Sequence, residues 1–329
     1  MLKKSTLDKL KPSKNLLAFS AGGDSTALLF LLLQNKILFD IAIVDYGLRL
    51  QSKEEVAYAQ FLSKKYGFKC YIKSSKLLQS NFEAKAREVR YDFFEELISK
   101  YNYNNLLTAH HLGDRFEWML MQFCKGAGCV ELSGMKESDK RNNYTLIRPV
   151  LHLEKDELLR YLNANSIKYF EDESNSDESY KRNYFRTHHA KPLLQKYLSG
   201  IKKSFTYLDE DTQILHQEVN IKEVDDFAYF NSSNKRSDIV NIDKYLKRKG
   251  FLISAKEREL LKDEKTVVIS RKIVVNQNLG FVFMMPYLKN VEMSKEFKEK
   301  MRILKVEPKL RPFIYKNPKV NELISSLLS

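Results

Sequence analysis

The chain has 329 residues, 43% hydrophobic and 30% charged, which is typical of a globular protein with about two domains of roughly 100–200 residues each. Its longest apolar run, residues 27–33, is far shorter than the about 20 residues that a membrane-spanning helix needs, and residues 1–15 hold no apolar signal-peptide core. The formal net charge of +14 is shared equally between residues 1–200 and 201–329, so either part is able to face a polyanion, although a generally lysine-rich surface would give the same balance.

Short β-rich segments alternate with longer helical patterns up to about residue 200. In residues 82–101 the apolar residues recur at the three- and four-residue steps of one helix face. This alternation predicts an α/β fold, a parallel sheet with helices on both faces. The expected strands are 16–19, 39–44, 68–72, 106–108 and 145–147. The expected helices are 25–34, 54–66, 82–101, 114–124 and 154–165.

A polar, turn-like segment, residues 172–179, is followed by a helical pattern over 180–198. We place a domain boundary near Ser199–Gly200, which gives a catalytic domain, 1–199, and a basic domain, 200–329. Residues 265–287 read as two strands joined by a turn at 276–280. The second domain is therefore expected to be a smaller α+β domain, and it holds no catalytic motif.

The segment "SAGGDS", residues 20–25, joins the first predicted strand to the first predicted helix. Ligands of open α/β sheets bind at the carboxyl ends of the strands, and a helix that begins there offers free N–H groups to an anion. Glycines allow a close approach of the backbone, and the hydroxyls of Ser20, Ser25 and Thr26 are able to donate to phosphate oxygens. The loop is thus a candidate phosphate site. A plain strand–helix turn capped by Asp24 or Ser25 remains open.

Two more polar clusters fall directly after predicted strands. "VDYGLR", residues 44–49, follows the second strand, and "TAHHLGDRFE", residues 108–117, follows the fourth. Because the carboxyl ends of parallel strands meet at one edge of a sheet, we expect these clusters to surround the same ligand as the 20–25 loop.

These motifs resemble those of the N-type ATP pyrophosphatases and, more narrowly, of the tRNA(Ile)-lysidine synthetases. "FSAGGDS" is similar to the pyrophosphate loop S-G-G-x-D-S, "VDYGLR" to V-D-H-G-L-R, and "TAHHLGDRFEW" to T-A-H-H-x-D-D-x-x-E-T. Further matches lie at 83–94, 126–135, 148–151 and 171–186, in order and at the family's spacing. The chain departs from the patterns at Ala21, Tyr46, Gly113 and Glu173. Ala21 replaces a glycine and is expected to have a negative φ.

The resemblance implies a PP-loop ATPase fold of the Rossmann-like type and a two-step ligation. ATP adenylates the C2 oxygen of the wobble cytidine of a tRNA(Ile) with a CAU anticodon, and pyrophosphate leaves. Free lysine then attacks C2 through its ε-amine and displaces AMP, which changes decoding from AUG to AUA.

The resemblance also implies roles for residues. The ATP-binding residues would be Ser20, Ala21, Gly22, Gly23, Asp24 and Ser25. Asp24 is the candidate for holding Mg²⁺ or positioning the triphosphate. Asp114 and Glu117, three residues apart, would bind the lysine ammonium, and one of them would accept its proton. The candidates for binding substrate or phosphate are Asp45, Arg49, Arg87, Arg182, Asn183 and Arg186.

Ordinary structural roles remain open as alternatives for several of these residues. Asp114 and Glu117 would also suit the first turn of an ordinary helix, where acids complement the helix dipole. Arg182 and Arg186, one helical turn apart, would also suit a solvated helix face paired with Asp177 or Glu178. His110 and His111 are adjacent and diverge in direction, so we expect hydrogen-bonded histidines and no zinc site.

Two other functions compete with the ligase. A tRNA thiolase of the same superfamily needs sulfur-carrying or cluster-binding cysteines, whereas Cys70, Cys124 and Cys129 include no CxxC pair. The second alternative is an RNA-binding relic without ATP chemistry, suggested by Ala21 and Gly113. The cysteine pattern also excludes a disulfide framework, and we expect a cytoplasmic protein with no membrane contact.

Overall fold

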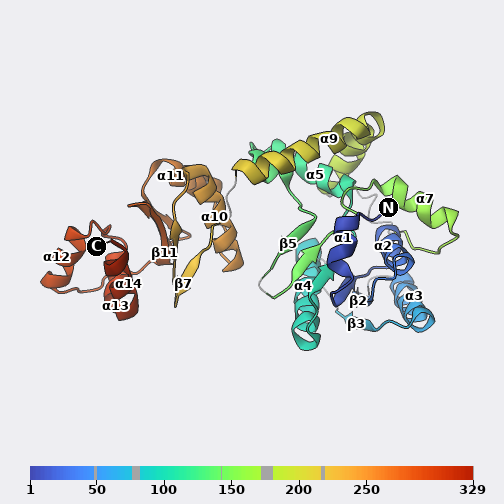
Figure 1. Ribbon diagram of the computed structural model, residues 1–329, viewed down its shortest axis with the longest axis horizontal. Helices are drawn as coiled ribbons and strands as arrows, with labels where there is room; N and C mark the ends of the chain where they lie inside the picture. Colours follow the sequence, from blue (N-terminus) through green and yellow to red (C-terminus); the bar gives the residue numbers. More distant parts are fainter. Residues whose placement is uncertain (48–49, 76–81, 142, 172–180, 216–218, 329) are drawn as a thin grey trace. The chain divides into compact units, whose positions relative to one another are not determined.

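The computed structural model describes residues 1–47, 50–75, 82–141, 143–171, 181–215 and 219–328. They form two compact units, Met1–Glu210 and Asp211–Ser329 (Figure 1). The Ser199–Gly200 dipeptide, where the sequence suggested a boundary, lies inside the long helix α9 (Lys191–Leu215). The residue ranges of the two functional domains therefore stay a prediction.

The first unit is built on a six-stranded sheet with the order β3-β2-β1-β4-β6-β5. Neighbouring strands run parallel except for β5, which pairs antiparallel with β6 at the edge. The strands are β1 (Asn15–Ala18), β2 (Phe39–Asp45), β3 (Cys70–Ser74), β4 (Asn105–Leu107), β5 (Ser138–Lys140) and β6 (Thr145–Ile147). The predicted parallel α/β sheet is confirmed, and all five predicted strands are present within two residues at each end.

Helices connect the strands and continue beyond them. They are α1 (Lys4–Leu10), α2 (Gly23–Gln34), α3 (Leu50–Tyr66), α4 (Phe82–Tyr101), α5 (Leu112–Phe123), α6 (Cys129–Ser133), α7 (Lys155–Ala164), α8 (Lys181–Phe185), the π-helix η2 (Arg186–Ala190) and α9. The short helices α1 and α6 were not predicted, because five to seven residues give too little periodicity. The predicted segment 180–198 divides into α8, η2 and the start of α9.

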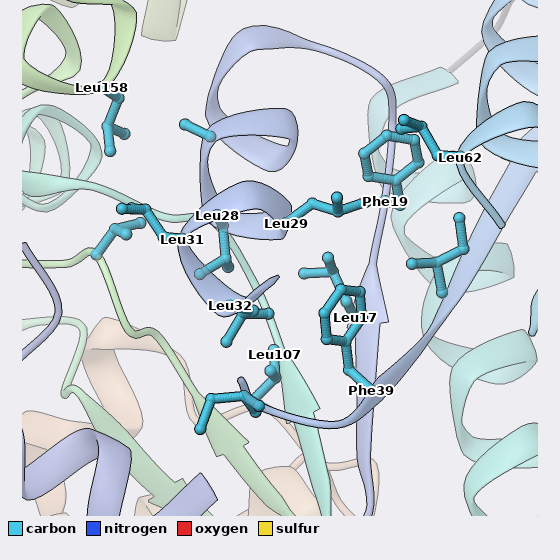
Figure 2. Packing of buried hydrophobic residues seen from close by; sticks show 14 of the residues in the cluster. Leu17, Phe19, Leu28, Leu29, Leu31, Leu32, Phe39, Leu62, Leu107 and Leu158 are labelled. Carbon is cyan, nitrogen blue, oxygen red and sulfur yellow. The ribbon is translucent and has the colours of Figure 1, made fainter. Parts of the chain in front are cut away.

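Apolar side chains cover both faces of the sheet, as its apolar strands require. On one face, Leu17 and Ile41 pack beneath α2, α3 and α7, and Figure 2 shows Leu28, Leu29 and Leu32 of α2 gathered over the sheet residue Leu17. On the other face, Leu16, Ala42, Leu106 and Leu146 contact the apolar stripe of α4. Both faces of the sheet are therefore covered, and a site has to be built at its edges.

The second unit holds an antiparallel sheet with the order β7-β8-β11-β10-β9. Its strands are β7 (Lys222–Val224), β8 (Phe227–Asn231), β9 (Thr266–Ile269), β10 (Ile273–Asn278) and β11 (Phe281–Pro286). The predicted turn at 276–280 is the β10–β11 hairpin, whose turn residues Leu279 and Gly280 both have positive φ. The prediction of two strands in 265–287 is wrong, because the chain turns once more at Ser270 and Arg271, both with positive φ, and β9 pairs antiparallel with β10. Helices α10 (Lys235–Arg248), α11 (Ala255–Asp263), α12 (Lys295–Ile303), α13 (Arg311–Lys316) and α14 (Pro318–Leu328) complete the expected α+β domain.

Candidate active site

The three polar loops meet at one edge of the parallel sheet. Strand β1 lies between β2 and β4, with Ala18 opposite Ala42 and Leu17 opposite Leu107. The loops that follow these three strands therefore leave the same edge side by side, as the sequence predicted.

Ser25 holds the loop after β1 in shape. Its hydroxyl donates to the Gly22 carbonyl (3.1 Å), accepts the Ser20 N–H (3.2 Å) and lies 3.1 Å from the Ser20 hydroxyl. In this state the Ser25 hydroxyl is used inside the loop, so its predicted contact with phosphate stays a prediction. The expectation for Thr26 is wrong, because its side chain is fully buried.

The two glycines of the loop, Gly22 and Gly23, differ in backbone conformation and in the space around them. Gly22, before α2, has an ordinary extended conformation with φ −71°. Gly23 begins α2 so close to α7 that a Cβ there would lie 2.9 Å from the Leu159 Cδ2 atom. The glycine pair thus lets the N-terminus of α2 pack tightly and leaves its first N–H groups at the sheet edge, where an anion is stabilised.

The backbone conformation of Ala21 differs from the one expected from the sequence. Its φ is +58°, in the left-handed region, whereas the sequence analysis expected a negative φ. The residue is fully buried, its carbonyl accepts the Phe170 N–H (3.0 Å), and Gly22 forms a parallel bridge with Phe170. This bridge holds the strained conformation, which costs an alanine about 1 kcal/mol.

His111 is the N-cap of α5. Its Nδ1 accepts the Gly113 N–H (3.0 Å), while its own backbone N–H donates to Asp114 Oδ2 (3.0 Å). Because Nδ1 accepts this bond, Nε2 is the ring nitrogen that is able to donate. That Nε2 lies 3.6 Å from Asp114 Oδ2 and 3.8 Å from Asp24 Oδ2. His111 therefore stands between the phosphate loop and the acids of α5.

Asp114 and Glu117 are bound by the two arginines of the following helical segment. Arg182 donates to Asp114 Oδ1 (2.6 Å) and to Glu117 Oε2 (2.9 Å). Arg186 donates to Glu117 Oε1 (2.6 Å) and to Oε2 (3.1 Å). We call these four residues the acid–arginine cluster. It joins two sets of predicted site residues that the sequence assigned to separate tasks.

The cluster holds the Asp114 carboxylate ionised. Burial alone would raise the pKa of Asp114, but the neighbouring His111 and Arg182 hold that pKa well below its usual range. Burial would likewise lower the pKa of Arg186, but its bond to Glu117 raises it. His110 beside the cluster hydrogen-bonds Thr108 through Nδ1 (2.9 Å), and burial lowers its pKa to about 4, so it is neutral at pH 7. A carboxylate with a depressed pKa is a weak base, which favours binding over proton acceptance by Asp114.

Asp24, on the other side of His111 from Asp114, has a carboxylate oxygen without a hydrogen-bond partner among the described residues. This oxygen, Oδ1, is buried. Together, Asp24, Asp114 and Glu117 carry three negative charges against the two positive charges of Arg182 and Arg186. A site with one excess negative charge and an unsatisfied carboxylate oxygen is suited to a cation.

The remaining predicted residues lie outside this cluster or outside the described residues. Asp45 ends β2, where its Oδ1 accepts the Gly47 N–H (2.8 Å). Arg87 is exposed on α4, with its guanidinium 4.6 Å from the Tyr91 ring centre. Asn183 lies between the two arginines on α8. Arg49, and the partners Asp177 and Glu178 suggested for the arginines, lie outside the described residues.

Two arginines at the site escaped the sequence analysis. Arg115 is buried on α5 and donates through Nε to the Ser133 carbonyl (3.0 Å) and through Nη1 to Asp209 on α9 (3.1 Å). Arg148, after β6, is buried, and its Nε has no partner in the described part of the chain. Only their positions in matching motifs, beside Asp114 and before Pro149, offered a signal.

Comparisons with known proteins agree with this geometry. A family model described as a PP-loop domain matches residues 2–193. A tRNA(Ile)-lysidine synthase of Campylobacter jejuni (strain RM1221) is 42% identical over 327 residues, 99% of this chain and 99% of that protein. One of Helicobacter pylori (strain ATCC 700392 / 26695) is 40% identical over 314 residues, 95% of this chain and 92% of that protein.

A solved structure shares the fold. The U34-tRNA thiolase NcsA from Methanococcus maripaludis, with its [4Fe-4S] cluster, superposes with a TM-score of 0.53 at 18% identity, over 64% of this chain and 75% of that one. At this identity the likeness concerns the fold alone. In the described ranges, no helix of the chain combines the length and apolarity needed to cross a membrane.

Proposed function

The chain belongs to the tRNA(Ile)-lysidine synthase family, and we propose that it joins free lysine to C2 of the wobble cytidine in a tRNA(Ile) with a CAU anticodon. It is an ATP-dependent ligase with a PP-loop domain, which forms a C–N bond and releases AMP and pyrophosphate. The observation that carries the proposal is the meeting of the phosphate loop and the acid–arginine cluster at one sheet edge, linked by His111.

In the first step the C2 oxygen of the cytidine attacks the α-phosphorus of ATP, and pyrophosphate leaves. The departing negative charge needs stabilisation, which backbone N–H groups at the start of α2 supply without reorganisation. The Ser20–Ser25 hydroxyl pair fixes the loop that carries these groups. Ser20, Ala21, Gly22, Gly23, Asp24 and Ser25 are accordingly the residues that we propose to bind ATP.

Mg²⁺ is the cation that we propose for Asp24. Magnesium in nucleotide sites is held by one or two carboxylates together with the phosphates of the substrate. The unpartnered Oδ1 of Asp24, next to the anion site of α2, fits this donor set. The described residues hold no group of three or more His, Cys, Asp or Glu placed for a metal, so the phosphates would supply the other ligands. When bound, the ion would neutralise charge on the triphosphate.

In the second step the ε-amine of lysine attacks C2 and displaces AMP. We propose that Asp114 and Glu117 attract the lysine ammonium, since the cluster together with Asp24 keeps one excess negative charge after both arginines are counted. Arg182 and Arg186 position the two carboxylates through their hydrogen bonds. Because their bonds to the two acids are short, lysine has to enter beside the guanidinium groups or displace one of them.

The RNA would bind through phosphate contacts from both parts of the chain, since each carries the same excess of positive charge. Asp45, Arg49, Arg87 and Asn183 remain proposed contacts of substrate or phosphate. We further propose that the enzyme meets its tRNA in the cytoplasm.

Incorporation of labelled lysine tests the function. The full chain, ATP, Mg²⁺ and a tRNA(Ile) transcript with a CAU anticodon are expected to give lysine-labelled tRNA together with AMP and pyrophosphate. The matched control is the same transcript with adenine in place of the wobble cytidine, which has no equivalent C2 oxygen. Labelled tRNA from neither transcript, in a reaction where the protein binds RNA, would contradict the proposal and favour an RNA-binding protein without ATP chemistry.

A further inference from the structure

An exposed tryptophan stands at the rim of the acid–arginine cluster. Trp118 is the only tryptophan of the chain, and 45% of it is exposed. It follows Glu117 directly and lies four residues after Asp114 on α5. In an α-helix, residues four apart point within about 40° of each other, so the indole leaves the helix on nearly the same side as the Asp114 carboxylate.

The indole of Trp118 packs against the backbone of Gly134. Gly134, which follows α6, has φ +63°, and a Cβ there would lie 2.7 Å from Trp118 Cδ1 and 3.2 Å from Nε1. The ring edge therefore rests on the Gly134 backbone, at a distance that no larger residue allows. A flat aromatic surface that is already packed against the backbone binds another ring with less loss of conformational entropy than a freely rotating side chain.

The order of groups along this edge argues for the kind of ring. From the phosphate loop, Asp24 is followed by His111, then by Asp114, and Trp118 lies about one helical turn, roughly 6 Å, further along α5. The triphosphate end of the site is thus opposite to the indole. The reaction requires an unstacked base beyond the α-phosphate, and single-stranded RNA bases are bound on aromatic side chains.

We infer that Trp118 is a stacking platform for a base of the anticodon loop. The inference rests on the proposed function and extends it, because it assigns a residue that contributes affinity for the RNA and holds the loop open beside the acid–arginine cluster. The adenine of ATP is the competing ring, and separate titrations with RNA and with ATP distinguish the two.

The fluorescence of the single tryptophan reports on this contact directly. We would titrate the full chain with an anticodon stem–loop RNA containing CAU, with a fully paired duplex of the same length, and with ATP plus Mg²⁺. Binding of each RNA would be followed separately through the anisotropy of a dye on that RNA. The stem–loop is expected to quench Trp118 saturably and to protect it from acrylamide, whereas the duplex and ATP leave it unchanged.

Variants make the test quantitative. Trp118→Ala is expected to weaken stem–loop binding by about 5- to 150-fold, the range that corresponds to loss of one base–aromatic stack. Trp118→Phe keeps a ring and most of the affinity. Phe123→Ala, which removes another exposed aromatic of α5 (66% exposed), is the matched control and leaves affinity unchanged. Because stacking involves no counterion release, Trp118→Ala shifts affinity without changing its salt dependence.

The outcomes separate this inference from the proposed function. A stem–loop that binds by anisotropy but leaves Trp118 fluorescence unchanged overturns the inference alone. Quenching by ATP without RNA overturns it in favour of adenine, and equal loss of affinity in Trp118→Ala and Phe123→Ala overturns the assignment to Trp118. A stem–loop that fails to bind at all overturns the proposed function together with the inference.

Discussion

The imidazole of His111 lies against the backbone of Gly113, so close that a Cβ on residue 113 would lie 2.8 Å from its Cε1 and 3.0 Å from its Nδ1. The glycine therefore makes room for the ring that caps α5 and faces both Asp24 and Asp114. The departure from the family pattern at this position has a physical consequence, because a side chain here requires His111 to move.

Gly113→Ala is expected to destabilise the protein by about 1–2 kcal/mol, since it displaces the cap of α5. In an unobstructed helix the same change stabilises by up to about 1 kcal/mol. Gly200→Ala provides that control, because a Cβ at Gly200, inside α9, meets nothing within 4 Å. Urea unfolding of both variants measures the difference. A Gly113→Ala protein as stabilised as Gly200→Ala would show that His111 does not depend on the glycine.

His110 predicts a pH dependence of stability. Burial lowers the pKa of His110 from 6.5 to about 4. Between these two pH values His110 is therefore protonated in the unfolded chain and neutral in the folded protein. The contribution of His110 to the free energy of unfolding is therefore fully present above pH 6.5. It is lost as the pH drops towards 4, by up to about 3 kcal/mol. His110→Gln is expected to flatten the curve of unfolding free energy in this window. The control, His189→Gln, changes an exposed histidine and leaves the slope as it is.

Arg186 and Glu117 predict a measurable coupling energy. The Glu117 carboxylate is almost fully buried and receives two bonds from Arg186. Arg186→Met leaves the buried Glu117 carboxylate with only Arg182, and Glu117→Gln takes the carboxylate partner away from Arg186, so each single variant is destabilising. A double-mutant cycle in urea unfolding is expected to give about 1.5–3 kcal/mol. The control is the exposed pair Arg302–Glu299 on α12, which should show no measurable coupling energy. If the Glu117–Arg186 pair also shows no coupling energy, the cluster does not stabilise the fold.

The sheet was predictable from sequence because its strands are short apolar runs separated by helical periodicity, and both patterns are local. Their common edge followed from one rule about parallel strands. The pairing of Arg182 and Arg186 with Asp114 and Glu117 was not predictable, because it joins residues 65–69 positions apart, and no local pattern reports which charges meet.

Ala21 shows the other limit of the sequence. Residue preference predicts a negative φ for alanine, but the Ala21 carbonyl and Gly22 are both tied to Phe170, about 150 residues later, and this bridge overrides the preference. His111 was expected to be a hydrogen-bonded histidine, and it is one. Its position between two carboxylates depends on Gly113, which sequence alone presented only as a missing aspartate.

The charge of the chain predicts salt-dependent RNA binding. With a net charge of +14 spread over both parts, phosphate contacts should supply much of the affinity, and each contact releases counterions. The affinity for tRNA is expected to fall roughly 100-fold or more between about 50 and 200 mM salt, as measured by filter binding. A flat response would remove the argument for backbone contacts while leaving the chemistry at the sheet edge untouched.

Asp114→Asn tests the division of labour within the site. The variant loses one negative charge of the cluster and keeps the shape of the side chain, so the cluster no longer attracts a cation. We expect the KM for lysine to rise by about 10- to 100-fold, the loss of one charged hydrogen bond, while pyrophosphate release from ATP and tRNA without lysine changes far less. Asp156→Asn, at an exposed acid in the first turn of α7, is the control. If Asp114→Asn slows pyrophosphate release and lysine transfer equally, Asp114 serves the adenylation step or the fold, and the lysine site has to be sought at Asp24 and Glu117.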